Sequence, residues 1–303
     1  MDDAYTVCAL VAYDGADYHG FQAQANAPSI QQALEEALDR CAERCSRVTG
    51  AGRTDAGVHA TGQVIAVAAR WRHSLAALQR AWNVHLPPAI AVRSVQTAPP
   101  GFHPRFSALS RTYRYTVQCG GQEGRAAVSR SPLTRRYAWF EARALDVAAM
   151  NEVSATLIGE HDFATFGWPP QGEKTVRVVE AAHWTWVQET PPALGSYAGP
   201  QVVFTITANA FLRQMVRGLV GALLAVGRGD WSAQDFAAAW AAADRRRAAP
   251  PAAPYGLVLE NVAYPEHLAA LIFEKERSMH RLQQSASQAP SALRHGKENL
   301  RED

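Results

Sequence analysis

The sequence predicts an α+β protein in which two ferredoxin-like halves, related by pseudo-symmetry, join into an extended, mostly antiparallel sheet with a central cleft. Strand and helix patterns alternate as β-α-β-β-α-β through the first 107 residues. A similar alternation recurs up to residue 265 without visible sequence repetition. At 303 residues, 48% of them hydrophobic, the chain can also bury a substantial core.

The alternation divides the chain into two halves and a tail. The halves are expected at 1–107 and 108–265, with a cleft between them where a ligand would sit. Beyond 265 the apolar periodicity is lost and Gln, Ser, Arg and Glu dominate. Such a segment cannot bury enough apolar surface to fold, so we expect 266–303 to be a disordered tail.

The first half opens with a mostly apolar strand at 5–13. Ser29, which follows a proline, is a candidate N-cap, and apolar residues then recur at helical spacing through Cys41 and Cys45. The remaining elements of this half are short strands and one helix, at 47–51 (strand), 63–71 (strand), 75–84 (helix) and 90–95 (strand).

The second half follows the same plan with a basic, Gly-rich excursion at 120–136 and a Pro-containing loop at 188–200. Its expected elements are strands at 111–119, 176–187, 202–208 and 257–262, and helices at 145–158, 211–226 and 233–243. Four-stranded sheets of this kind are common RNA-binding surfaces, although the fold by itself does not determine function.

Composition excludes few functions. The net charge of +2 neither requires nor excludes nucleic acid, and the preference for Arg over Lys is also explained by a GC-rich coding bias. The longest apolar stretch, 219–226, is too short to span a bilayer, and the acidic N-terminus does not resemble a signal peptide. The four cysteines lack metal-site spacing, so we expect a reduced, cytoplasmic protein.

The most informative segment is the loop at 50–60, Gly-Ala-Gly-Arg-Thr-Asp-Ala-Gly-Val-His-Ala. It carries the carboxylate of Asp55, with Arg53 two residues before it and His59 four residues after it. Flanking glycines would allow a bulky planar partner to reach that carboxylate. Taken alone, however, the loop is equally consistent with a turn, because Asp and Gly are common turn residues.

A second charged residue is expected to be buried. Arg217 is the only charge between 215 and 226, on a helix that is apolar on nearly every side. A buried guanidinium without a partner is costly, so a carboxylate should lie close to it. If that partner is Asp55, the pair forms an anchored, ionised carboxylate in the cleft. A purely structural ion pair is the alternative.

Aromatic residues lie near these charges in the sequence. On the strand at 111–119, Tyr113 and Tyr115 share one face and Arg114 points to the other. Either tyrosine could stack on a base or fill the core. The preceding segment 102–107, Phe-His-Pro-Arg-Phe-Ser, mixes aromatic and cationic groups, a composition that suits single-stranded nucleic acid.

Together these motifs resemble the TruA family of tRNA pseudouridine synthases. The resemblance extends from 11 to 265 and is strongest in the loop at 50–60. Supporting stretches occur in the same order, at 13–22, 83–87, 102–107, 113–115, 159–163, 209–211, 215–217 and 256–257.

This resemblance implies conversion of uridine to pseudouridine in the anticodon stem-loop of tRNA, at positions 38–40. Asp55 matches the catalytic aspartate, a nucleophile towards either the sugar C1′ or the base. Tyr113 matches the tyrosine that stacks on the target base, and Arg217 the arginine that pairs with the aspartate. Arg53 matches a residue associated with displacing the base from its helix.

The family uses no metal and no organic cofactor, and its members are homodimers whose tRNA contacts both subunits. Further candidates for RNA contact are cationic or imidazole side chains near these motifs: His59, His103, Arg105, Arg111 and Arg114. The main alternative is a non-catalytic tRNA-binding protein on the same fold, which the intact catalytic positions disfavour. A hydrolase is a weaker alternative, since no Lys or metal-binding carboxylates accompany the loop.

Overall fold

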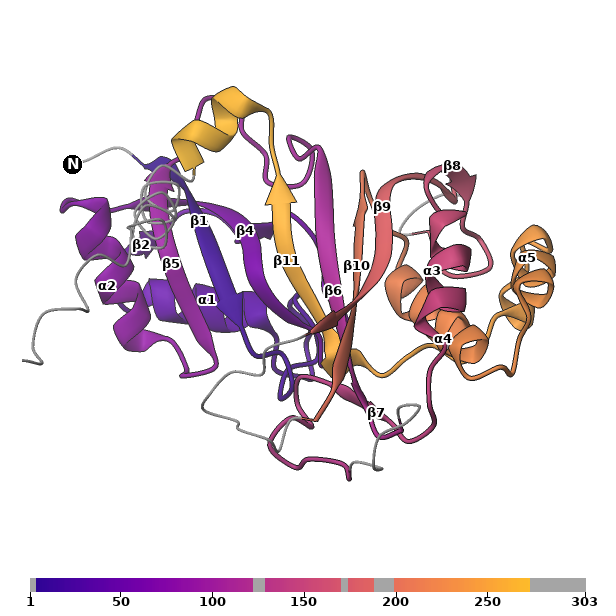
Figure 1. Cartoon of the computed structure of the whole chain (residues 1–303). Helices are drawn as coiled ribbons and strands as arrows, with labels where there is room; N and C mark the ends of the chain where they lie inside the picture. The colour runs from indigo at the N-terminus through magenta and orange to yellow at the C-terminus, as the bar shows by residue number, and fades with distance from the viewer. Residues whose placement is uncertain (1–3, 122–128, 170–173, 188–198, 273–303) are drawn as a thin grey trace, which may run out of the picture.

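A computed structural model describes residues 4–121, 129–169, 174–187 and 199–272. Within them the strands form one large sheet in the order β5-β1-β4-β11-β6-β10-β9-β8, with β2 and β3 added to β4 and β7 to β6 (Figure 1). The strands are β1 Tyr5–Tyr13, β2 Glu43–Arg44, β3 Thr49–Gly50, β4 His59–Arg70, β5 Ile90–Thr97, β6 Ser110–Cys119, β7 Trp139–Glu141, β8 Gly159–Asp162, β9 Val176–Val187, β10 Gln201–Ala208 and β11 Leu257–Ala263.

The labelled α-helices beside this sheet are α1 Ile30–Asp39, α2 Leu75–His85, α3 Val147–Ala155, α4 Met215–Gly227 and α5 Ala233–Ala241, and a further helical segment follows β11 at 266–272. Helices α1 and α2 accompany the strands of the first half, and α3 to α5 those of the second (Figure 1). All strand pairs are antiparallel except β4 with β11 and β6 with β7. The predicted α+β class with a mostly antiparallel sheet is confirmed.

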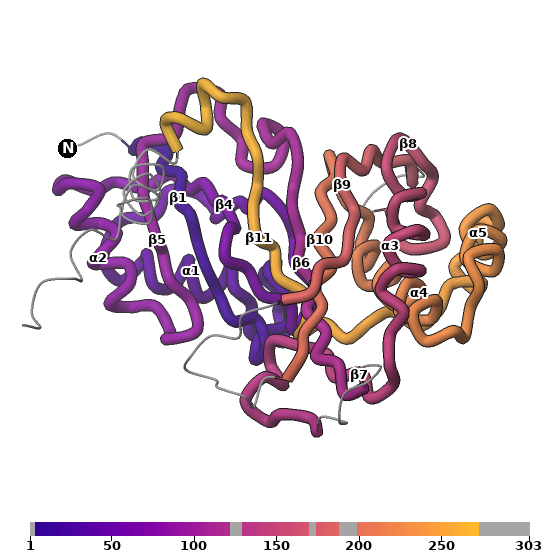
Figure 2. Tube along the Cα trace, in the orientation of Figure 1, coloured from indigo at the N-terminus to yellow at the C-terminus, as the bar shows by residue number. Residues whose placement is uncertain are grey.

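Strand β11, the last strand in the sequence, joins the two halves in the middle of the sheet. In Figure 2 the yellow trace of β11 runs up the middle of the molecule, between β4 and β6. It pairs in parallel with β4 at Val258 opposite His59 and Leu259 opposite Ala60. Gly62 lies so close to the Glu260 carbonyl that a Cβ there would collide with it. The joint between the halves, where β4 pairs with β11, therefore begins at His59, directly after the loop that carries Asp55.

Helix α1 begins as the sequence predicts, because the Ser29 side chain accepts a hydrogen bond from the Gln32 N–H. It ends at Asp39, so the expectation that Cys41 and Cys45 continue the helical pattern is wrong. Residues 43–44 instead form β2 and pair with the end of β4. The sheet edge offers that segment backbone partners, which outweigh a helical spacing of apolar residues.

Helix α4 is buried on almost every side, as predicted, but it begins four residues later than predicted. Gln214 has φ +62°, which interrupts the helix, and Arg213 pairs with Trp168 instead. Within α4, the backbone at Gly218 and Gly221 lies against the carbonyls of Phe166 and Pro250, where a side chain would collide. These close contacts fix the position of α4 against its neighbours and therefore the position from which Arg217 extends.

The short strands β7 and β8 were not expected, because segments of three and four residues carry too little periodicity. The chain also continues as a helix over 266–272, where Ile272 is 1% exposed. The expected tail therefore cannot begin at 266. Its remainder, 273–303, and the loop at 188–198 lie outside the described residues.

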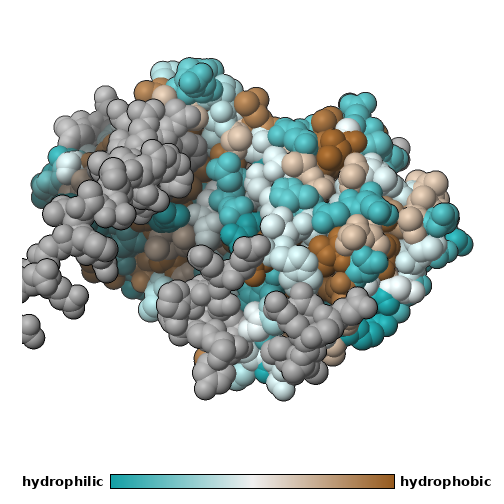
Figure 3. Space-filling view, viewed as in Figure 1, coloured by the Kyte–Doolittle hydropathy of each residue, from teal (hydrophilic) through white to brown (hydrophobic). Residues whose placement is uncertain are grey.

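The sheet face around β11, β6 and β10 is polar. Hydrophilic and neutral side chains cover the middle of the view in Figure 3. Along these strands Arg114 pairs with Glu260, and the Thr112 and Thr207 hydroxyls lie 2.9 Å apart. No helix in the described part of the chain is long and apolar enough to cross a membrane.

Candidate active site

The loop at 51–58 is held on the side of β1 and β4 by a buried polar network. Gln63, fully buried on β4, donates from Nε2 to the Gly52 carbonyl (2.8 Å) and to the Tyr13 hydroxyl (3.3 Å). That hydroxyl lies 2.9 Å from the Thr54 Oγ1. Burial raises the pKa of Tyr13 to about 12, so it stays a neutral hydrogen-bonding group. The network fixes the residue immediately before Asp55.

The segment 18–23 holds the same loop from the other side. The Phe21 N–H donates to the Thr54 carbonyl (3.1 Å), and the Gly57 N–H donates to the Tyr18 carbonyl (3.1 Å). Gly20, at φ +98°, lies where a Cβ would be 2.8 Å from the Thr54 carbonyl oxygen. This approach requires glycine.

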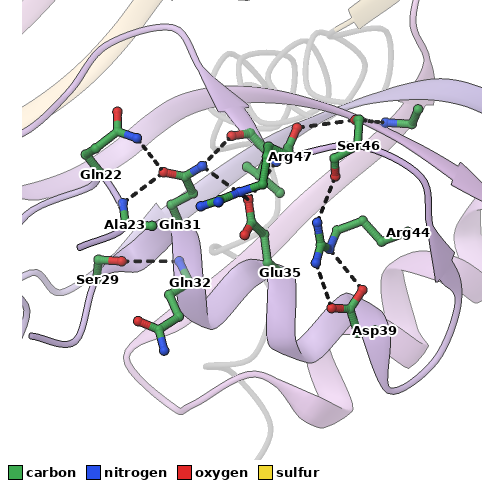
Figure 4. Close-up of polar contacts among 12 residues, drawn as sticks. Gln22, Ala23, Ser29, Gln31, Gln32, Glu35, Asp39, Arg44, Ser46 and Arg47 are labelled. Atoms are coloured by element: carbon green, nitrogen blue, oxygen red, sulfur yellow. Dashed lines mark hydrogen bonds and ion pairs between the residues drawn. The ribbon is translucent and has the colours of Figure 1, made fainter. Parts of the chain in front are cut away.

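A buried glutamine anchors that segment to the body of the first half (Figure 4). The Gln31 Oε1 accepts hydrogen bonds from the Gln22 Nε2 (3.0 Å) and the Ala23 N–H (2.9 Å). Its Nε2 donates to the Val48 carbonyl (2.9 Å) and to the Glu35 carboxylate (3.1 Å). The loop around Asp55 is therefore packed between rigid partners on both sides.

Asp55 and Arg217 meet across the joint between the halves. The Arg217 Nη1 lies 3.4 Å from the Asp55 Oδ2, although the two residues are 162 positions apart. The Arg217 Nε also donates to the Ala252 carbonyl (2.8 Å), which orients the guanidinium. The carboxylate is 22% exposed and the guanidinium 14%. The carboxylate that the burial of Arg217 demanded is thus Asp55, and it remains reachable from solvent.

Tyr113 completes this group. Its side chain lies on the same side of the sheet as the Asp55 loop, with the hydroxyl 3.7 Å from a Cβ placed on Gly52. Phe211 packs edge-on against its ring at a centroid distance of 5.1 Å. Burial raises the pKa of Tyr113, and the nearby Tyr13 and Asp55 add to this effect. Within the described residues its hydroxyl has no hydrogen-bond partner.

The structure gives His59 a different place from the RNA contact expected. It is 3% exposed, and its Nε2 lies 2.7 Å from the Arg136 carbonyl and 3.1 Å from the Tyr255 carbonyl. Its Nδ1 lies 3.0 Å from the Asp14 carboxylate. An RNA cannot reach a ring enclosed in this way, so His59 connects the two halves instead.

Arg111 and Arg114 both have partners within the protein. The Arg111 guanidinium is buried and donates to the carbonyls of Ala51, Arg105, Ala108 and Asn209, which leaves it unavailable to a phosphate. Arg114 pairs with Glu260 on the sheet face opposite Tyr113. Burial thus removes Arg111 from the candidate RNA contacts, whereas RNA contact by Arg114, which is 44% exposed, stays a prediction.

Arg53 and Arg105 are exposed and His103 is partly exposed, so all three can reach a ligand. The sequence interpretation missed Phe106 as a candidate, although its ring is 76% exposed. It also missed the supporting roles of Tyr13 and Gln63. The aromatic and cationic composition of 102–107 is a signal that could have identified Phe106, whereas the burial of a single amide leaves no signal in local patterning.

A cavity of about 410 Å³ opens beside the loop, at the joint between the halves. Asp17 and Gly57 of the first half line it, together with Arg130, Arg135 and Tyr255 of the second. Among the described residues, no group of three or more His, Cys, Asp or Glu side chains is arranged to hold a metal ion.

Comparison with known proteins agrees with this geometry. A family model described as tRNA pseudouridine synthase matches residues 9–107 and 153–265. The chain is 41% identical to tRNA pseudouridine synthase A of Chloroflexus aurantiacus, over 90% of this chain and 93% of that protein. It is 44% identical to tRNA pseudouridine synthase A of Roseiflexus castenholzii, over 84% of this chain and 89% of that protein.

Among solved structures, the crystal structure of a Cbf5-Nop10-Gar1 complex aligns over 74% of this chain and 45% of that one. The identity is 13% and the TM-score 0.32. The family model covers most of the chain and the sequence relatives cover nearly all of it. The chain therefore belongs to the tRNA pseudouridine synthase family.

Proposed function

We propose that the protein isomerises uridine to pseudouridine in the anticodon stem-loop of tRNA, at positions 38–40. The observation that carries this proposal is the juxtaposition of Asp55, Arg217 and Tyr113 at the joint between the halves. A carboxylate, its cationic partner and an aromatic ring come from three distant segments of the chain. Both relatives carry the name tRNA pseudouridine synthase A, which supports tRNA as the substrate.

Asp55 acts as the nucleophile, towards either C1′ of the ribose or the uracil ring. The C1′–N1 bond breaks, the base turns, and a C1′–C5 bond forms; C5 then loses its proton to solvent and N1 takes one up, so that product and substrate are isomers. Arg217, 3.4 Å away, pairs with the carboxylate and directs it. Tyr113 stacks on the target base, and burial keeps its hydroxyl neutral by raising its pKa.

Arg53 displaces the target uridine from its helix. It is exposed and lies two residues before Asp55 on the loop that two sets of hydrogen bonds hold in place. Removing a stacked base costs a few kcal/mol, and a cation held in a fixed position beside Asp55 can offset part of that cost by binding the displaced nucleotide.

We also infer that the two halves, 1–107 and 108–265, are copies of one ferredoxin-like unit. In the first, the strand order is β5-β1-β4-β3, and in the second it is β11-β6-β10-β9. Each order places the fourth, first, third and second strands of a βαββαβ unit side by side. We further propose a homodimer that acts in the cytoplasm, where tRNA is found and where free cysteines such as Cys8 stay reduced.

Tritium release provides the test. The substrate is tRNA with tritium at uridine C5, incubated with wild-type protein and Asp55→Asn in parallel. Because C1′–C5 bond formation expels that hydrogen, we expect release by the wild type and none by the variant, with both still binding tRNA. Equal release would exclude the nucleophile role of Asp55. Binding without release by the wild type would favour the non-catalytic alternative.

A further inference from the structure

Phe106 forms an unusually exposed aromatic surface for a globular protein. Its ring is 76% exposed, yet it is not isolated. The His103 ring lies behind it at a centroid distance of 4.4 Å and an interplanar angle of 31°, and the Arg105 guanidinium lies 5.6 Å from its centroid. The ring is therefore in contact with neighbouring side chains while the residue remains largely open to solvent.

The turn that carries this ring is rigid. The His103 Nδ1 accepts hydrogen bonds from the N–H groups of Arg105 (3.1 Å) and Phe106 (3.2 Å). The Ser107 Oγ accepts from the His103 N–H (3.1 Å), and the Tyr264 hydroxyl donates to the Pro104 carbonyl (2.7 Å). A rigid aromatic loses little entropy when it binds a partner.

The same turn is tied to the Asp55 loop by Arg111. The Arg111 Nη2 donates both to the Arg105 carbonyl and to the Ala51 carbonyl (3.0 Å). Ala51 precedes Arg53 by two residues, so Phe106 and the loop are held in one frame. The cation that lies beside the ring is the Arg105 guanidinium.

We propose that Phe106 is a stacking platform for an unpaired base of the RNA, adjacent to the uridine that reaches Asp55. This inference rests on the proposed function. An exposed aromatic ring can stack on any base, and the Arg105 guanidinium beside it can neutralise a flanking phosphate. An exposed aromatic side chain next to a cation is the combination that single-stranded nucleic acid binds.

The test measures binding in the Asp55→Asn background, so that turnover does not complicate it. The ligand is an anticodon stem-loop RNA with 2-aminopurine at the unpaired loop positions in turn, since stacking quenches this base. We expect Phe106→Ala to raise Kd about tenfold and to abolish quenching at one loop position. Phe106→Tyr should retain both, and Phe106→Leu should resemble Phe106→Ala because it lacks a π face.

Leu109→Ala is the matched control, since Leu109 is 56% exposed in the same segment but is not aromatic. It should leave Kd and quenching unchanged. Wild-type quenching and affinity in Phe106→Leu would overturn the proposal, as would a change of oligomeric state in Phe106→Ala, which would make the ring a protein contact. Failure of the proposed function would show separately, as absence of tritium release by the wild type.

Discussion

Replacing Arg217 with Met tests whether the Asp55–Arg217 pair has the energy that its geometry implies. At the observed 3.4 Å, Coulomb's law gives about 1 kcal/mol in water and about 5 kcal/mol at an effective dielectric constant of 20. Because the Asp55 and Arg217 side chains are 22% and 14% exposed, solvent screens part of this attraction, and we take the interaction energy of the pair as about 2 kcal/mol. The lost hydrogen bond to the Ala252 carbonyl adds about 1 kcal/mol.

The assay is a double-mutant cycle in urea. We expect Arg217→Met to lower the free energy of unfolding by about 3 kcal/mol. Combined with Asp55→Asn, it should show a coupling free energy of about 2 kcal/mol. If the same interaction orients the carboxylate during the reaction, kcat for tritium release should fall about 30-fold, which corresponds to that coupling.

An exposed pair on the opposite sheet face provides the control. Arg114 and Glu260 lie closer together, at 3.0 Å, but are 44% and 37% exposed, so the coupling between Arg114→Met and Glu260→Gln should stay below about 0.5 kcal/mol. The reasoning would be refuted if the Asp55 cycle gave a coupling no larger than this control.

Three further predictions concern the frame around the site. Gly20→Ala should lower the free energy of unfolding by about 2 kcal/mol and reduce turnover, because of its positive φ and its contact with the Thr54 carbonyl; Gly101→Ala, also at positive φ but with nothing within 4 Å, should cost less and leave turnover unchanged. Burial raises the pKa of Asp14, but hydrogen bonds from the Ala16 N–H and the Tyr137 hydroxyl, together with the charges of His59 and Arg136, lower it overall. Its ionised form therefore stabilises the fold at pH values above the ordinary pKa of 3.8, and this stabilisation is lost as the pH falls through the lowered pKa of the folded state. Urea unfolding of Asp14→Asn should therefore differ from wild type at pH 7, and the difference should shrink as the pH falls below 3.8. Truncation after Pro265 should lower Tm as Ile272→Ala does, since Ile272 is 1% exposed and burying such a side chain contributes about 2 kcal/mol; an unchanged Tm would show that the 266–272 helix adds nothing.

Much of the fold could be predicted from local patterns. Strand β1, the Ser29 N-cap and the burial of α4 follow from periodicity and capping, which depend on residues close in sequence. The boundaries that differed, such as the start of α4 at Met215, depend on contacts with distant segments. Gln214 takes a positive φ next to Arg213, which pairs with the distant Trp168, and no local pattern encodes that pairing.

The sequence by itself determined that Asp55 lies in a glycine-flanked loop and that a buried Arg217 needs a carboxylate. Both follow from residue chemistry and the cost of burying charge. Only the tertiary structure decided which charged side chains face a ligand. His59 and Arg111 look like RNA contacts in the sequence, yet both are buried and bonded to backbone carbonyls, while Phe106 is open. Exposure and partners depend on how β4, β6 and β11 meet, which is a property of the whole sheet.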